Sequence, residues 1–164
     1  ADRHLNTWRQ LKDSVDVKHY PEVVYALTWA AKHFESNESR SKAVECFEEV
    51  IEMTELSLKA VREDRARIEK ILKLISEKDD EKANQFREEI LDERRTIEIK
   101  EKSIVSDLVK QYLSLSKVYA SVRAFESSIS LIKKLRSLLS EIKDDPDYAD
   151  ILETIESSEL NLKE

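Results

Sequence analysis

Apolar residues recur three and four positions apart along almost the whole chain, which is the spacing that places them on one face of an α-helix. Prolines and short polar stretches interrupt this pattern, for example at Pro21 and at the acidic residues around Pro146. The pattern predicts six helices, at about residues 3–17, 21–34, 41–78, 80–122, 125–142 and 148–162. The chain contains no glycine, on which short turns between strands depend, so we expect an all-α protein.

The segment at residues 41–78 is the longest and most regular of these. Its apolar positions over residues 44–75 alternate strides of three and four, which is the heptad pattern of a coiled coil. A sparser heptad pattern follows over residues 86–122. Two arrangements fit: an antiparallel hairpin of two helices, or one unbroken rod across residues 76–84 that a second chain would cover. We expect the hairpin, because long unpaired helices are only marginally stable in water.

Two stretches of the chain share a pattern of small and bulky residues at identical spacing, 85 residues apart (from residue 27 to residue 112). The first reads Leu27, Ala30, Ala31, Phe34, Ala43, Phe47 and Val50, and the second reads Tyr112, Leu115, Ser116, Tyr119, Ser128, Ile132 and Leu135. Small residues such as Ala31 and Ala43 allow two helices to cross closely, while an aromatic residue such as Phe34 fills the wedge between them. The pattern resembles the tetratricopeptide repeat.

The resemblance is incomplete in two respects. The usual tight turn between paired helices, which often contains glycine, is absent from both stretches. The proline that normally ends each repeat is replaced by Glu55 in the first stretch and by Ser140 in the second. We therefore expect the second helix of the first stretch to continue past the repeat and to form part of the hairpin.

The resemblance implies a single domain (residues 1–164) composed of a tetratricopeptide-like α-solenoid base and a long projecting antiparallel coiled-coil hairpin. The base would comprise residues 1–55 and 106–164, and the hairpin would comprise residues 56–105. Repeat arrays need a capping element at each end, and the sixth helix is expected to cap the stack.

Ligands of tetratricopeptide domains lie along the first helix of each repeat, on the side turned away from the second helix. Carried over by spacing, the resemblance implies partner-binding residues at six positions: Tyr25, Thr28, Lys32, Lys110, Leu113 and Lys117. The family's clamp for carboxylate-ended chaperone tails normally includes asparagines at such positions. None of these six residues is asparagine, so we do not expect that ligand.

Charged residues make up 38% of the chain, and the formal net charge is −7. Nucleic acids and anionic membranes are bound through an excess of lysine and arginine, so we do not expect either as the main partner. Two basic stretches occur, at residues 62–73 and 133–136; acidic residues interleave with the first, which is typical of a salt-bridged surface. Arg65 lies on the apolar seam, where we expect an ion pair across the hairpin with a carboxylate such as Glu93.

The sequence contains no motif for catalysis or for a bound metal or cofactor. A glycine-rich phosphate loop and a nucleophile elbow both need glycine, which the chain lacks. The three histidines are too far apart in sequence to form a metal pair on one helix. Cys46 is the single cysteine, and we expect it to be a small buried residue. We therefore expect a protein that is not an enzyme.

The expected function is that of an adaptor or scaffold, which binds a peptide or helix of another protein in a groove of the base or along the hairpin. The alternative is self-association, in which the heptad seam pairs between two chains to form a homodimer. The chain has no apolar run long enough to span a bilayer and no signal-peptide pattern at its start. An intracellular protein, in the cytoplasm or the nucleus, is the corresponding expectation.

Overall fold

The structure, a computed structural model, describes residues 1–163 of the chain. These residues form six α-helices and contain no strand. The α-helices are α1 (Asp2–Leu11), α2 (Tyr20–Ser36), α3 (Arg40–Ile75), α4 (Glu81–Ser121), α5 (Phe125–Leu138) and α6 (Tyr148–Lys163). Short 3-10 helices in the same part of the chain are η1 (Lys12–Ser14), η2 (Val17–His19) and η3 (Leu139–Ile142). The prediction of an all-helical fold is confirmed.

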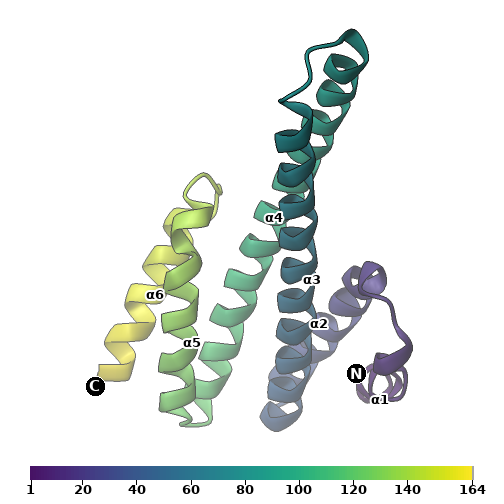
Figure 1. The fold of residues 1–164 in the computed structure, drawn as a ribbon. Coiled ribbons are helices and arrows are strands. Elements are labelled where there is room, and N and C mark those ends of the chain that lie inside the picture. Colours follow the sequence, from purple (N-terminus) through teal and green to yellow (C-terminus); the bar gives the residue numbers. More distant parts are fainter. Residues whose placement is uncertain (164) are drawn as a thin grey trace.

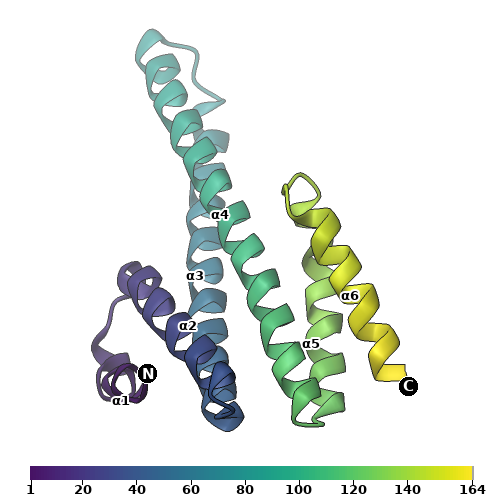
Figure 2. The same ribbon diagram turned by 180° about the vertical axis from the view of Figure 1, so that it is seen from behind.

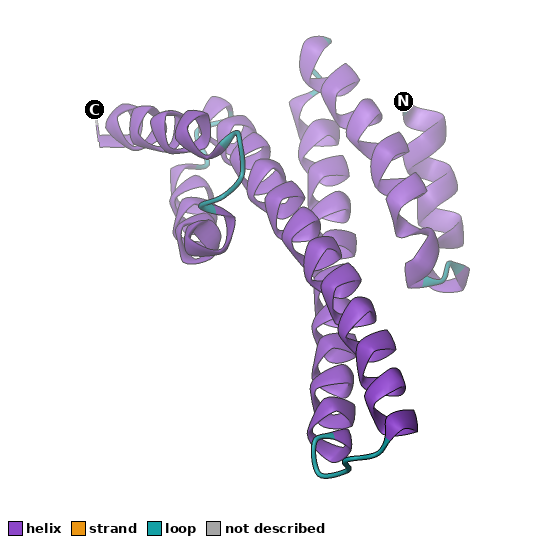
Figure 3. Ribbon diagram, turned by 90° about the horizontal axis from the view of Figure 1, so that it is seen from above, coloured by secondary structure: helices purple, strands orange, loops and turns teal. Residues whose placement is uncertain are grey.

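The helices form two layers. Figure 1 shows α3 and α5 nearer to the viewer, and Figure 2, from behind, shows α2, α4 and α6 in front of them. Each α-helix packs against the next one in the chain. The helices α3 and α4 have 36 and 41 residues, and their joined ends extend beyond the rest of the molecule (Figure 1). Seen from above, α1 and α2 lie on one side of this pair, and α5 and α6 lie on the other (Figure 3).

The chain ascends α3, reverses over residues 76–80 and returns along α4 (Figure 1). Residues late in α3 therefore contact residues early in α4. Glu69 forms an ion pair with Arg94 (3.4 Å), and the carbonyl oxygen of Ile75 accepts a hydrogen bond from Arg87 (3.1 Å). The two helices are separate, so the chain does not form one continuous rod.

Apolar contacts are concentrated in the base of the molecule, away from the joined ends of α3 and α4. One cluster of buried residues includes members of all six α-helices, among them Leu27, Phe47, Leu108, Leu135 and Ile155. A second, smaller cluster lies between α3 and α4 beyond the base, and its buried members are Ile68, Ile75 and Ile90. Burial of apolar surface is the main source of stability, so the base is the more stable part and the projecting part has a thin core.

The turn between α2 and α3 and the turn between α4 and α5 have the same backbone geometry. Glu38 and Arg123 adopt the left-handed conformation, with φ of 60° and 63°, and lie 85 residues apart (from residue 38 to residue 123). At each turn the backbone N–H of the next residue donates a hydrogen bond of 2.8 Å to the carbonyl oxygen five positions before it. The spacing equals that of the repeated sequence pattern, so the two stretches share a turn as well as a pattern of side chains. The expectation that a tight turn is absent from both stretches is wrong, because residues 37–39 and 122–124 form short turns without glycine.

Some apolar residues at helical spacing, which would place them on an inward face, are exposed. The first helix ends at Leu11 rather than near residue 17, because the backbone turns into η1 and η2, and Leu11 is 49% exposed. In α5, Phe125 and Ile129 are 46% and 40% exposed. Ser128 is buried instead. Successive residues of a helix lie about 100° apart around its axis, so Ile129 is turned away from the core.

Cys46 is fully buried in α3, which confirms the expectation of a small core residue. Burial raises the pKa of its thiol to about 11. The reactive form of cysteine is the thiolate, so at neutral pH the folded protein presents almost no reactive Cys46, and the side chain serves as an apolar filler beside its neighbours in the core.

Replacement of Glu38 or Arg123 by glycine is expected to stabilise the protein. Glycine adopts the left-handed conformation without steric strain, and this gain exceeds the entropy that glycine adds to the unfolded chain, so each change should raise the free energy of unfolding by about 0.5–1 kcal/mol. Urea denaturation followed by circular dichroism measures the change. Lys70→Gly, at an exposed position in the interior of α3, is the control and should cost about 1 kcal/mol. A loss of stability in both turn variants would contradict this account.

Candidate functional site

A groove runs between α3 and α5, with α4 as its floor, and we call it the α3–α5 groove. Its volume is about 530 Å³, and the two helices that form its walls, α3 and α5, both lie nearer to the viewer than α4 in Figure 1. Its lining consists of Glu55, Leu58, Lys59, Arg62, Glu63 and Ala66 from α3, Leu108 and Tyr112 from α4, and Lys134, Ser137 and Leu138 from α5. The α3 residues follow one another over about three turns, so the groove runs along the helix.

The floor of the α3–α5 groove is mainly apolar. Leu58 and Leu108 are buried at its base, and Leu138 is half-buried at its side. The hydroxyl of Tyr112 donates a hydrogen bond to the carboxylate of Glu55, and burial together with this bond raises the pKa of Tyr112. The tyrosine therefore stays neutral, and the floor offers a ligand an uncharged surface.

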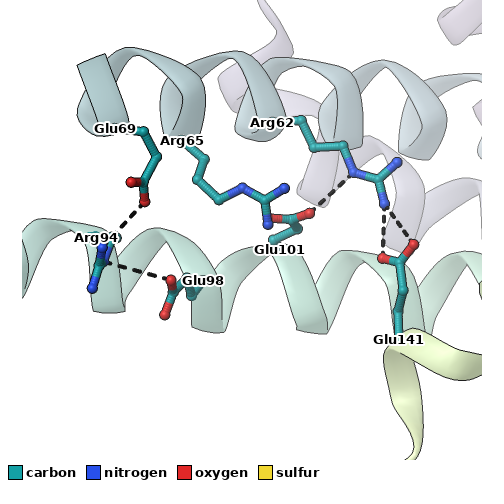
Figure 4. Close-up of polar contacts among 7 residues, drawn as sticks. All are labelled: Arg62, Arg65, Glu69, Arg94, Glu98, Glu101 and Glu141. Atoms are coloured by element: carbon teal, nitrogen blue, oxygen red, sulfur yellow. Dashed lines mark hydrogen bonds and ion pairs between the residues drawn. The ribbon is translucent and has the colours of Figure 1, made fainter. Parts of the chain in front are cut away.

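A second hollow adjoins the groove at Arg62, where η3 lies beside the α3–α4 pair, and we call it the fork cleft. Its volume is about 840 Å³. Its lining is mostly charged: Arg62, Arg65, Arg95, Glu98, Ile99, Glu101, Lys102, Val105 and Glu141. Figure 4 shows that several of these residues are joined by ion pairs from α3 to α4 and from α3 to η3.

The carboxylate of Glu101 lies between two arginines at the centre of these ion pairs. Its side chain is only 7% exposed, and it accepts a hydrogen bond of 3.1 Å from Nε of Arg62 (Figure 4). Its other oxygen has no hydrogen bond but lies 2.7 Å from Nη1 of Arg65. The predicted ion pair of Arg65 with a carboxylate of the facing helix is confirmed, but its partner is Glu101 and not Glu93, because the register of α3 against α4 places Glu101, about two turns later, opposite both arginines.

Arg62 also connects the α3–α4 pair to η3. Its Nη2 donates hydrogen bonds to both carboxylate oxygens of Glu141, over 3.1 and 2.8 Å (Figure 4). Burial lowers the pKa of the Arg62 guanidinium, but the hydrogen bonds and charges of Glu101 and Glu141 outweigh burial and raise this pKa overall. Arg62 is therefore a permanent cation that borders both hollows.

Three of the six residues carried over from the repeat family, Tyr25, Thr28 and Lys32, lie on α2. Tyr25 is 79% exposed, Lys32 is exposed and Thr28 is half-buried. Trp29 on the same helix is 52% exposed, and its ring stacks on that of His33 with centroids 5.5 Å apart. These residues form an open surface that belongs to neither the α3–α5 groove nor the fork cleft.

The other three, Lys110, Leu113 and Lys117, lie on α4. Lys110 forms an ion pair of 2.9 Å with Asp147, and this hydrogen bond raises the pKa of Lys110. Leu113 is 8% exposed and belongs to the core. Lys117 is exposed and borders a hollow of about 340 Å³ between α4, α5 and α6. The structure does not bring the α2 set and the α4 set together in any of the hollows described here.

The sequence did not identify the groove or the fork cleft as a site. Arg62 and Arg65 belong to the first basic stretch, which is predicted to be a salt-bridged surface, and Lys134 belongs to the second. That interpretation is right for Arg62 and Arg65, whereas Lys134 has no ion pair among residues 1–163. One sequence feature could have indicated the groove, namely Glu55 at the position where the repeat normally has a terminating proline. The helix continues past Glu55 and supplies most of one groove wall.

Metal ligands and membrane spans are two further kinds of site. Within residues 1–163, no group of three or more histidine, cysteine, aspartate and glutamate side chains is arranged to hold a metal ion. Over the same residues, no helix combines the length and the apolar character needed to cross a membrane.

Replacement of Glu101 by glutamine is expected to lower the free energy of unfolding by about 1–3 kcal/mol, because a neutral amide cannot balance two arginines at a buried position. Urea denaturation measures the change. Glu98→Gln is the matched control: Glu98 also borders the fork cleft and pairs with an arginine, but its side chain is 49% exposed, so the change should stay below about 0.5 kcal/mol. Equal losses in the two variants would show that the burial of Glu101 has no special effect.

No protein-family model matches this chain, and no curated protein or solved structure matches it. The resemblance to tetratricopeptide repeats therefore rests on the residue pattern of the chain alone, and the turns at Glu38 and Arg123 show only that the two stretches resemble each other. The α3–α5 groove and the fork cleft form the candidate functional site on geometric and chemical grounds alone.

Proposed function

We propose that this protein is an adaptor that binds a helical segment of a partner protein in the α3–α5 groove. The observation that supports this most directly is the groove itself, which has an apolar floor and lies open between two helices. A groove of this kind accepts an amphipathic helix through apolar anchors one turn apart. The wall formed by α3 presents residues at the same intervals, from Glu55 through Leu58 and Arg62 to Ala66.

A helix fits the groove better than other ligands. Residues 55–66 of α3 rise by about 17 Å, so an occupant of about three helical turns would lie along the wall. An extended peptide that adds to a sheet needs an exposed strand, and residues 1–163 contain none. Sites for small molecules are mostly enclosed and apolar, whereas this groove is open and bordered by charges.

The proposal includes an architecture. The base would be an α-solenoid of the tetratricopeptide kind, and α3 and α4 would form an antiparallel coiled-coil hairpin that projects from it. The equivalent turns at Glu38 and Arg123 support the repeat, and the buried isoleucines between α3 and α4 support the coiled coil. In this proposal the protein has no catalytic role and acts inside the cell, where a single thiol such as that of Cys46 stays reduced.

Self-association is the second candidate, and exposed apolar side chains on the α3–α4 pair favour it. Leu74, Phe86 and Ile99 are 69%, 47% and 70% exposed, and a second chain could cover them in a homodimer. Light scattering at two protein concentrations separates the candidates. A mass that equals one chain of 19.2 kDa at both concentrations excludes the homodimer.

A photoreactive residue in the groove should capture the partner. Ala66 on the α3 wall and Ser137 on the α5 wall would each be replaced by p-benzoylphenylalanine, because both line the groove. After irradiation in a matched cell extract, mass spectrometry identifies the attached peptide. We expect both positions to capture the same segment of the same protein, attached through opposite sides of one helix.

Arg67 and Lys133 are matched control positions, since they lie on the same two helices and are exposed but do not line the groove. The photoreactive residue at these positions should not capture the segment. Capture at the control positions alone, or equal capture at all four positions, would contradict binding in the groove.

A further inference from the structure

We infer that the segment bound in the α3–α5 groove is an acidic amphipathic helix, an inference that rests on the proposed function. Its apolar side would lie over the leucines of the floor, Leu58, Leu108 and Leu138. Its carboxylates would flank this apolar side and meet Lys59 on the α3 wall and Lys134 on the α5 wall. The occupant is thus defined by two properties, an apolar stripe and negative flanks.

Lys59 and Lys134 are the free cations of the groove. Both are exposed, they stand on opposite walls, and neither has an ion pair among residues 1–163. By contrast, Lys42 and Lys110 are paired with carboxylates of other helices or connections, at 2.6 and 2.9 Å. One unpaired lysine on each side of an apolar floor matches an amphipathic helix that has carboxylates on both flanks.

The remaining charges of the groove leave this preference in place. Arg62 is already paired with two carboxylates, and Glu55 accepts the hydroxyl hydrogen bond of Tyr112. Glu63 is the one other carboxylate of the lining, and it has no ion pair within the described residues. Glu55 keeps its charge, because the Tyr112 hydroxyl that it binds is neutral, and it has no ion pair within the described residues. The lining therefore carries three cations (Lys59, Arg62 and Lys134) and two carboxylates, a formal charge of +1 in a chain whose net charge is −7.

The fork cleft extends the same preference beyond Arg62. The ion pair of Lys102 with Asp144 is long, at 3.9 Å, and the Asp144 side chain is 95% exposed, so this pair is weak. Arg65 contacts Glu101 through Nη1 and has further N–H donors on its guanidinium. A helix that continues past Arg62 would thus meet cations again. A nucleic acid would share the negative charge, but the apolar floor favours a protein helix.

The test uses three fluorescent peptides of about 18 residues, which corresponds to about five helical turns. They share one stripe of leucines at helical spacing and differ only in the flanking residues, which are glutamate, glutamine or lysine. Fluorescence anisotropy with the full chain measures binding at low and high salt. We expect the glutamate peptide to bind about tenfold more tightly than the lysine peptide, with a smaller ratio at high salt.

Two double variants separate the groove from the overall charge of the chain. Lys59→Glu with Lys134→Glu should abolish the preference for the glutamate peptide. Arg67→Glu with Lys133→Glu makes the same change in net charge on the same helices outside the groove, and it should alter the preference by less than about twofold. Glu63→Gln should strengthen binding of the glutamate peptide. Circular dichroism shows that each variant is folded.

Equal binding of the three peptides, tighter binding of the lysine peptide, or displacement of the glutamate peptide by a short RNA or DNA at lower concentration would overturn the inference. The photoreactive residues at Ala66 and Ser137 distinguish this failure from failure of the proposed function. Capture of a basic or neutral helix there would overturn the acidic partner and leave the groove as a helix site. No capture at either position would remove both.

Discussion

The buried carboxylate of Glu101 determines how the projecting α3–α4 pair is joined to the base. Val105, one turn later, belongs to the main core, whereas beyond Glu101 only Ile68, Ile75 and Ile90 are buried between the two helices. A buried charge must be paired, and the register that is present brings two arginines of α3 to this one carboxylate. Ion pairs thus fix a register that the thin apolar contacts would leave free to slide, and Arg62 transmits it to η3 through Glu141.

The repeated turn shows a second constraint, which acts on the backbone. Glu38 and Arg123 hold the left-handed conformation in a chain without glycine, at a cost of about 1–2 kcal/mol each. Close crossing of the two helices that each turn connects offsets this cost. In the second stretch the hydroxyl of Ser128 donates a hydrogen bond of 2.9 Å to the carbonyl oxygen of Ser116, so the two small residues touch. The missing glycine changes the energy of the turn and leaves its shape intact.

Helix positions were predictable from the sequence because apolar period, prolines and polar breaks are local properties, and α2 to α6 follow them closely. Contacts between helices were not predictable from the sequence, because they depend on the register of one helix against another and on the angle between the helix axes. Many carboxylates of α4 were equivalent candidates for Arg65, and only the packed pair selects Glu101. Phe125 and Ile129 share the helical spacing of the buried Ile132, yet both are exposed, because the angle at which α5 packs turns them away from the core. The α3–α5 groove depends on how far two helices diverge, which no residue pattern specifies.

The groove and the projecting pair both depend on the continuation of α3 through Glu55. A proline at this position would interrupt the helix, since it lacks an N–H and clashes with the preceding turn. With glutamate there, α3 continues, and its next three turns supply Leu58, Arg62 and Ala66 to the groove before the helix leaves the base. The continuation of α3 past Glu55 thus produces both the projecting part of this helix and the wall of the groove that faces α5. If the groove binds a partner helix, the part of α3 beyond Glu55 belongs to the binding site, and the site would not survive its removal.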